Sequence, residues 1–207
     1  MNLIKLFKDE LKGFYKSKVM IFLWLGLPLL ALLIHLWQPE TGEELPFTAV
    51  SAILVSSIGG TLASVMLAVS IINEKNSKVY DLFLIRPIKR RDILISKFLA
   101  IYLCIAIASL LALSLGLIID YYTIGGTPET VLENAKDSII LSLSMMAISS
   151  SAGVLIGVLS PSILVGAILV IYGGNQISVI PLLPTILNIS NKQLFTVGIG
   201  ILFTVVL

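Results

Sequence analysis

Ionisable side chains are scarce along most of this chain, and their absence argues against several kinds of function. Only 13% of the 207 residues are charged, against roughly 25% in an ordinary soluble domain. The long apolar runs hold almost no carboxylate or ammonium group, and the chain has 1 histidine. A pump coupled to protons or sodium uses buried carboxylates, and an intramembrane metalloprotease needs an H-E-x-x-H type cluster. The composition disfavours both classes.

Nucleophiles and nucleotide sites are equally sparse. The single cysteine, Cys104, lies within an apolar run, so it forms no intrachain disulfide, and we expect a buried apolar residue. The stretch SLSMMAISSSAGVLIG is rich in serine, but besides His35 the apolar runs offer no histidine or lysine as a plausible base. No G-x-x-x-x-G-K-[ST] sequence occurs. We therefore expect no catalytic residue, cofactor or metal in this chain.

The sequence does contain several long runs of apolar residues. A helix crosses the roughly 30 Å hydrocarbon core with about 20 mostly apolar residues. The sequence predicts an all-α membrane protein with a single transmembrane domain, residues 19–207. Its six expected spans lie at about 19–37, 48–72, 98–119, 138–159, 163–180 and 194–207. The last run is still apolar at Leu207, so we expect the natural chain to continue past it, or its end to be disordered.

Residues 1–18 form an expected amphipathic helix. At 100° per residue, one side collects Leu3, Ile4, Phe7, Leu11, Phe14 and Tyr15. One flank collects Lys5, Lys8, Lys12 and Lys16. A basic amphipathic helix beside a membrane span usually lies in the interface with lipid headgroups. We therefore expect residues 1–18 to be a cytoplasmic interfacial helix.

Lysine and arginine are distributed asymmetrically along the chain. Residues 1–18 and 73–97 hold 12 of the 14, and both segments lie on one side of the membrane if the first two runs cross it. Cytoplasmic loops carry the excess of basic residues. The predicted localisation is a multi-pass protein of the plasma membrane with a cytoplasmic N-terminus.

Small residues are frequent in the run 138–159. Gly153 and Gly157 form a G-x-x-x-G pair, which favours close packing of two helices. The serines of the same run could instead line a mildly polar translocation path. The sequence favours packing and leaves the second interpretation open.

The segment 73–97 combines two kinds of residue. Lys89, Arg90 and Arg91 are expected to anchor it to anionic lipid at the membrane surface. Lipid anchoring does not explain VYDLFLI, which is apolar, too short to span, and ended by Pro87. An exposed apolar helix in the cytoplasm normally has a partner surface. We expect a short cytoplasmic helix at about Ser77–Ile85 that docks on another protein.

The order of these features resembles the permeases of ABC-2 type transporters, the membrane subunits of ATP-binding cassette exporters. In that family the loop between spans 2 and 3 carries a glutamate, a short helix with an apolar centre, Pro-hydrophobic-x-Arg, and Ile-Leu-x-x-Lys. The matching residues here are Glu74, Leu82-Phe83-Leu84, Pro87-Ile88-Lys89-Arg90 and Ile93-Leu94-Ile95-Ser96-Lys97. The chain departs from the family at Lys78-Val79, where Gly-Thr is often found.

The resemblance implies a coupling helix seated in a groove of a separate ATPase subunit, which binds ATP and Mg. It also implies a second permease copy, identical or homologous, and export of an amphipathic or hydrophobic cargo such as a peptide, antibiotic or lipid-like molecule. The implied roles are apolar docking by Tyr80, Leu82 and Phe83 and polar register by Asp81 and Lys78. Glu74 is expected to tie the segment to the base of a span. The implied interface as a whole is made of Glu74, Lys78, Tyr80, Asp81, Leu82, Phe83 and Arg86.

Two hypotheses from other classes stand beside the transporter. One is a non-transporting membrane scaffold or assembly factor whose basic loop recruits a soluble partner. The other is a lipid-modifying membrane enzyme, which the lack of His, Asp or Glu clusters disfavours. A neighbouring reading frame for an ATPase would favour the transporter, and its absence would favour the scaffold. None of the three hypotheses involves nucleic acid.

Overall fold

The computed structural model describes residues 3–37, 47–77, 89–123, 128–187 and 191–206. Within these ranges the chain is helical almost throughout and contains no strand. The first helices are α1 (Leu3–Tyr15), α2 (Lys18–Trp37), α3 (Phe47–Asn76), α5 (Arg90–Thr123) and α6 (Pro128–Leu159). A broken helical segment follows, made of α7 (Ile163–Leu169), the π-helix η1 (Val170–Gly174), α8 (Asn175–Ser178), the 3-10 helix η2 (Ile180–Leu182) and α9 (Leu183–Ile186). The last helix is α10 (Lys192–Val206).

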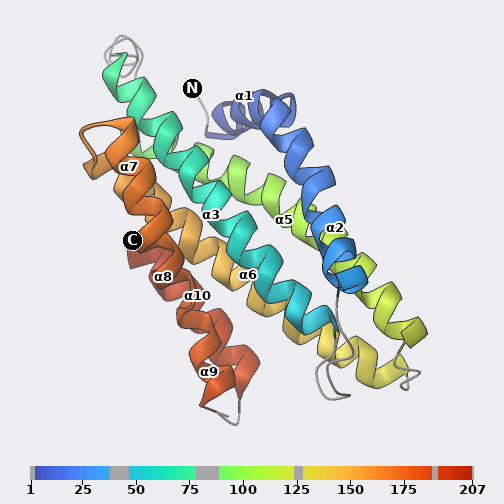
Figure 1. Cartoon of the computed structure of the whole chain (residues 1–207). Coiled ribbons are helices and arrows are strands. Elements are labelled where there is room, and N and C mark those ends of the chain that lie inside the picture. Colours follow the sequence, from blue (N-terminus) through green and yellow to red (C-terminus); the bar gives the residue numbers. More distant parts are fainter. Residues whose placement is uncertain (1–2, 38–46, 78–88, 124–127, 188–190, 207) are drawn as a thin grey trace.

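The long helices α2, α3, α5 and α6 lie side by side, and the chain reverses direction at each connection between them (Figure 1). Helix α1 lies across one end of this bundle, because the chain bends by 68° between Leu3–Tyr15 and Lys18–Leu33. The last turn of α3 and the first turn of α5 lie at that same end (Figure 1). The described residues on either side of 78–88, the stretch that carries most of the expected coupling residues, therefore lie at the same end of the bundle as α1 (Figure 1).

Four helical segments in the described part of the chain are long and apolar enough to cross a membrane. They are Thr48–Asn76, Arg91–Ile119, Leu132–Leu159 and Ile163–Leu182. The bent pair α1–α2 makes a fifth if it is counted as one span, and α10 is apolar but shorter. The expected all-helical fold, with several helices long and apolar enough to span a membrane, is confirmed for the described residues. The expected count of six crossings and the interfacial placement of residues 1–18 stay predictions.

Helices α3 and α6 approach each other most closely where both carry small residues. A Cβ atom added to Gly153 would lie 2.6 Å from the Cα and the carbonyl oxygen of Ser64. One added to Gly157 would lie 3.0 Å from the Cα of Ala68. Backbones at this distance tolerate no side chain between them, so the expected packing role of the G-x-x-x-G pair is confirmed.

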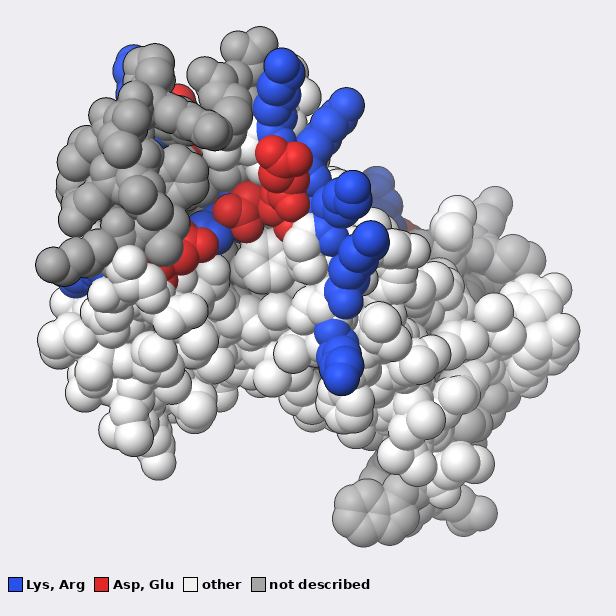
Figure 2. All heavy atoms as spheres, turned by 90° about the horizontal axis from the view of Figure 1, so that it is seen from above, with Lys and Arg blue, Asp and Glu red and all other residues white. Residues whose placement is uncertain are grey.

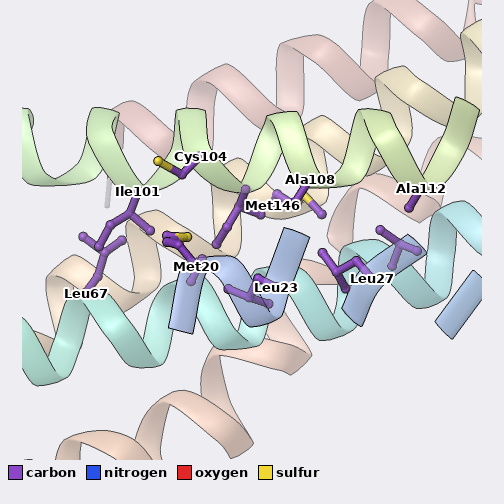
Figure 3. Close-up of a cluster of buried hydrophobic side chains, with 12 residues drawn as sticks. Met20, Leu23, Leu27, Leu67, Ile101, Cys104, Ala108, Ala112 and Met146 are labelled. Carbon is purple, nitrogen blue, oxygen red and sulfur yellow. The ribbon is translucent and has the colours of Figure 1, made fainter. Parts of the chain in front are cut away.

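The apolar core forms where α2, α3, α5 and α6 meet (Figure 3). Its labelled side chains are Met20, Leu23, Leu27, Leu67, Ile101, Cys104, Ala108, Ala112 and Met146. The indole Nε1 of Trp24 donates a hydrogen bond to the carbonyl of Cys104 at 3.1 Å, which joins α2 to α5. Cys104 is buried in this cluster, as the sequence leads one to expect.

Candidate functional site

Most of the expected coupling residues lie outside the described ranges. Lys78, Tyr80, Asp81, Leu82, Phe83 and Arg86 all belong to the connection 78–88. Of the expected lipid anchors, Lys89 and Arg91 are exposed, and the side chain of Arg90 is not described. Glu74 is described, and its surroundings contain the most unusual polar geometry of the described structure. Figure 2 shows that Lys and Arg side chains gather over this end of the molecule, with carboxylates among them.

The centre of that geometry is Lys97, a lysine on α5 with only 2% of its side chain exposed. Its Nζ atom lies 2.6 Å from Oε1 of Glu74, in the last turn of α3. The same Nζ atom lies 2.9 Å from Oε1 of Glu10, on α1. We call Lys97, Glu10 and Glu74 the Lys97 cluster. One buried ammonium group thus joins three helices.

Two further side chains, Ser70 and Phe14, contact the ammonium group of Lys97. Its Nζ atom lies 3.3 Å from the Ser70 hydroxyl oxygen, to which it donates a hydrogen bond. The ring centroid of Phe14 lies 5.9 Å from the same atom, within the range of a cation–π contact. An ammonium group has three N–H donors, and Glu74, Glu10 and Ser70 accept all of them. A buried charge with every donor satisfied is compatible with a stable fold.

The Lys97 cluster holds two carboxylates against one ammonium. Oε2 of Glu74 is buried and has no hydrogen-bond partner within the described ranges. Glu74 is also two residues before the end of α3, just ahead of the connection 78–88. The cluster therefore retains one unused acceptor at the base of the segment that the sequence associates with a partner.

The helical register explains why Lys97 faces inward. Ile93 and Ile101 are each four residues from Lys97 and are both buried, so all three lie on the core-facing side of α5. On α1, Leu6, Glu10 and Phe14 follow the same four-residue spacing; Leu6 is buried, and Glu10 and Phe14 are half-buried. The face of the N-terminal helix expected from periodicity needs correction at three positions.

Ile4 and Tyr15, placed on the apolar side of residues 1–18 by the sequence pattern, are 64% and 57% exposed. Leu6, which that pattern left out, is buried. The reason is that α1 packs on α5, and the ion pair with Lys97 turns Glu10 toward the bundle. The predicted flank of lysines does remain exposed at Lys5, Lys8, Lys12 and Lys16.

Lys75, next to Glu74, connects the same turn of α3 to α6. Its Nζ atom donates to the carbonyl oxygens of Val158 at 3.1 Å and Ser160 at 3.5 Å. These carbonyls end α6, where a cation also interacts favourably with the helix dipole. Two consecutive residues of α3 therefore bind two other helices, Glu74 through Lys97 of α5 and Lys75 through the end of α6, and α1 joins them through Glu10 on Lys97.

The described residues contain no group of three or more His, Cys, Asp or Glu side chains placed to hold a metal ion. A scan against protein-family models, a search of curated proteins and a search of solved structures each found no match to this chain. Its function has to be inferred from the residue pattern and from the geometry around Lys97.

Proposed function

We propose that this chain is the permease subunit of an ABC-2-like exporter. It moves an amphipathic or hydrophobic substrate, such as a peptide, an antibiotic or a lipid-like molecule, across the plasma membrane. A separate ATPase subunit, which binds ATP and Mg, supplies the energy. The permease works with a second copy, identical or homologous, and its N-terminus and the segment 73–97 lie in the cytoplasm.

The observation that supports this proposal most is the position of the Lys97 cluster. A partner that pushes on the connection 78–88 moves the transmembrane helices only if both ends of that connection are firmly held. Glu74 precedes the connection, Lys97 follows it, and the two are ion-paired with each other. Glu10 adds α1 to the same contact. Force on the connection is then delivered to three helices as one unit rather than absorbed by bending of a single helix end.

The roles within the connection follow the expected pattern. Tyr80, Leu82 and Phe83 supply the apolar contact with the ATPase, Lys78 and Asp81 set its register, and Arg86 belongs to the same interface. Lys89, Arg90 and Arg91 hold the segment at the surface of an anionic leaflet. Glu74 ties the segment to the base of α3.

The test is a pull-down of the detergent-solubilised chain, co-expressed with the ATPase of a neighbouring reading frame, followed by an ATPase assay with candidate cargo. Phe83→Glu should abolish co-purification, because it puts a charge into the apolar contact. Lys89→Gln changes the net charge of the segment by the same amount outside that contact and should leave co-purification intact. Retention of the ATPase by Phe83→Glu, with turnover still stimulated by cargo, would contradict the coupling role. Capture of a soluble partner without ATPase activity would favour the scaffold.

A further inference from the structure

The broken helical segment from α7 to α8 lies at the edge of the bundle. It contacts α3 and α6 on one side, and α2 lies on the opposite side of the bundle (Figure 1). Only 22% of the apolar window in Ile163–Leu182 is buried, against 44–56% in the other three segments long enough to span. This segment therefore has the largest uncovered fraction of the four.

That uncovered surface is not purely apolar. Tyr172 is 75% exposed, and Gln176, four residues later and so on nearly the same side, is also exposed. The preceding residue, Asn175, points to the bundle instead, since its Oδ1 accepts a hydrogen bond from the Ser57 hydroxyl at 3.1 Å. A Cβ atom added to Gly173 would meet nothing within 4 Å. The segment thus presents an amide, a phenol and an open glycine outward.

The depth of Gln176 makes its exposure costly. It lies 13 residues after Ile163 and six before Leu182, or roughly 20 Å and 9 Å from the ends of the segment at 1.5 Å per residue. Lipid tails offer no hydrogen bond to an amide at that depth. The outward face of α2, by contrast, consists of apolar side chains that suit lipid: Phe22, Leu25, Leu29, Leu32, Leu33 and Leu36.

We propose that the face bearing Tyr172 and Gln176 packs against the same face of a second copy of this chain, with the two Gln176 amides hydrogen-bonded to each other. A glutamine amide is both donor and acceptor. Across a two-fold axis, Nε2 of each Gln176 donates to Oε1 of the Gln176 in the other copy. Each amide therefore has a hydrogen-bond partner without the help of any other residue. Gly173 leaves room for the two backbones to approach. The inference rests on the proposed function, which requires two permease subunits, and assigns the surface by which they meet.

The single cysteine of the chain makes this surface testable by cross-linking. Cys104→Ala gives a chain without cysteine, into which Gln176→Cys or Leu32→Cys is introduced. Leu32 is a matched control because it is 41% exposed and lies 14 residues after the start of α2, a depth close to that of Gln176. Membranes are treated with a short, membrane-permeant bifunctional thiol reagent, which spans two facing side chains where a direct disulfide cannot. A covalent dimer is expected at position 176 and not at position 32.

The outcomes separate this surface from the proposed function. A dimer in lipid nanodiscs that cross-links at position 32 and not at 176 overturns the surface and leaves the dimeric permease standing. A monomer in nanodiscs overturns both. Cross-linking at position 176 in a chain that captures no ATPase would support the proposed dimer surface and contradict the proposed transporter function. Modification of the Gln176→Cys variant by a water-soluble thiol reagent, without cross-linking, overturns the surface in favour of a water-filled path.

A second variant tests the amide pair itself. Gln176→Leu should weaken dimerisation in nanodiscs roughly tenfold, since two interhelical hydrogen bonds of the usual strength amount to about 1.4 kcal/mol. Unchanged dimerisation would remove the amide pair from the interface.

Discussion

Replacing Lys97 by methionine isolates the contribution of the Lys97 cluster. Methionine is unbranched like lysine, is one atom shorter, and adapts to a buried site, so the main change is loss of the ammonium. At the observed separations of 2.6 and 2.9 Å, Coulomb attraction at an effective dielectric constant of about 20 is roughly 6 kcal/mol for each pair. Desolvation of the buried ions cancels much of this attraction, and removing one partner of a buried pair typically costs about 3–5 kcal/mol.

The lower end of that range applies here. The side chains of Glu10 and Glu74 are 24% and 25% exposed, so both carboxylates regain some water after the lysine is gone. About 3 kcal/mol corresponds to a fall in the apparent melting temperature of roughly 6–12 °C for a chain of this size. Fluorescence of the two tryptophans during heating in detergent reports the transition, and Trp24 lies in the core contact with Cys104.

Two controls make the result specific. Lys89→Met removes an exposed lysine at the same end of the molecule and should change the melting temperature by less than about 2 °C. The triple variant Lys97→Met, Glu10→Gln, Glu74→Gln removes all the charges and should recover part of the loss, because no uncompensated carboxylate remains buried. A single variant as stable as the parent, or a triple variant less stable than the single one, would refute the charge-pairing argument.

Two further substitutions probe how the helices are held together. Gly153→Ala inserts a methyl group 2.6 Å from the backbone of Ser64, so we expect a loss of about 1–3 kcal/mol and a melting temperature lower by roughly 2–12 °C. Gly198→Ala on α10 points into open space and should not lower the melting temperature, since alanine is the better helix former; an equal fall for the two glycines would contradict the close α3–α6 contact. Lys75→Met removes the hydrogen bonds to the last carbonyls of α6 and should cost about 1 kcal/mol, or roughly 2–4 °C, whereas Lys136→Met, at another exposed lysine, should not.

The apolar runs could be predicted from the sequence because bilayer thickness dictates their length. The residues at which the helices begin and end could not be predicted in the same way. Helix α5 begins at Arg90 and α6 at Pro128, several residues before the runs 98–119 and 138–159 start. The reason is that hydropathy senses the hydrocarbon core, whereas backbone hydrogen bonding continues through the headgroup region. Likewise the π-helix Val170–Gly174 interrupts the α-helix expected over the apolar run 163–180. The pair Gly173-Gly174 is the feature of the local sequence that favours such an irregularity.

The Lys97 cluster was only half visible in the sequence. Glu74 was expected at the base of a span, and Lys97 was noted only as part of the start of the next one. Its position four residues from both Ile93 and Ile101 places a charge on the apolar side of a helix, which demands a carboxylate partner. Nothing local identifies Glu10 as that partner, because the packing of α1 on α5 is a tertiary contact between distant parts of the chain. The docking role of residues 78–88 lies outside the described residues and stays a prediction.

The order of synthesis gives the pairing of Glu10 with Lys97 a consequence for membrane insertion. Glu10 leaves the ribosome first, whereas Lys97 follows only after α2 and α3 have been made. Until then Glu10 on α1 lacks the ammonium group of Lys97 as its partner. When α2 and α3 both cross the membrane, the start of α5 returns to the side of α1 and the contact can form. A nascent chain in which only one of α2 and α3 crossed the membrane would leave Glu10 and Lys97 on opposite faces, so the ion pair can form only when both or neither has crossed.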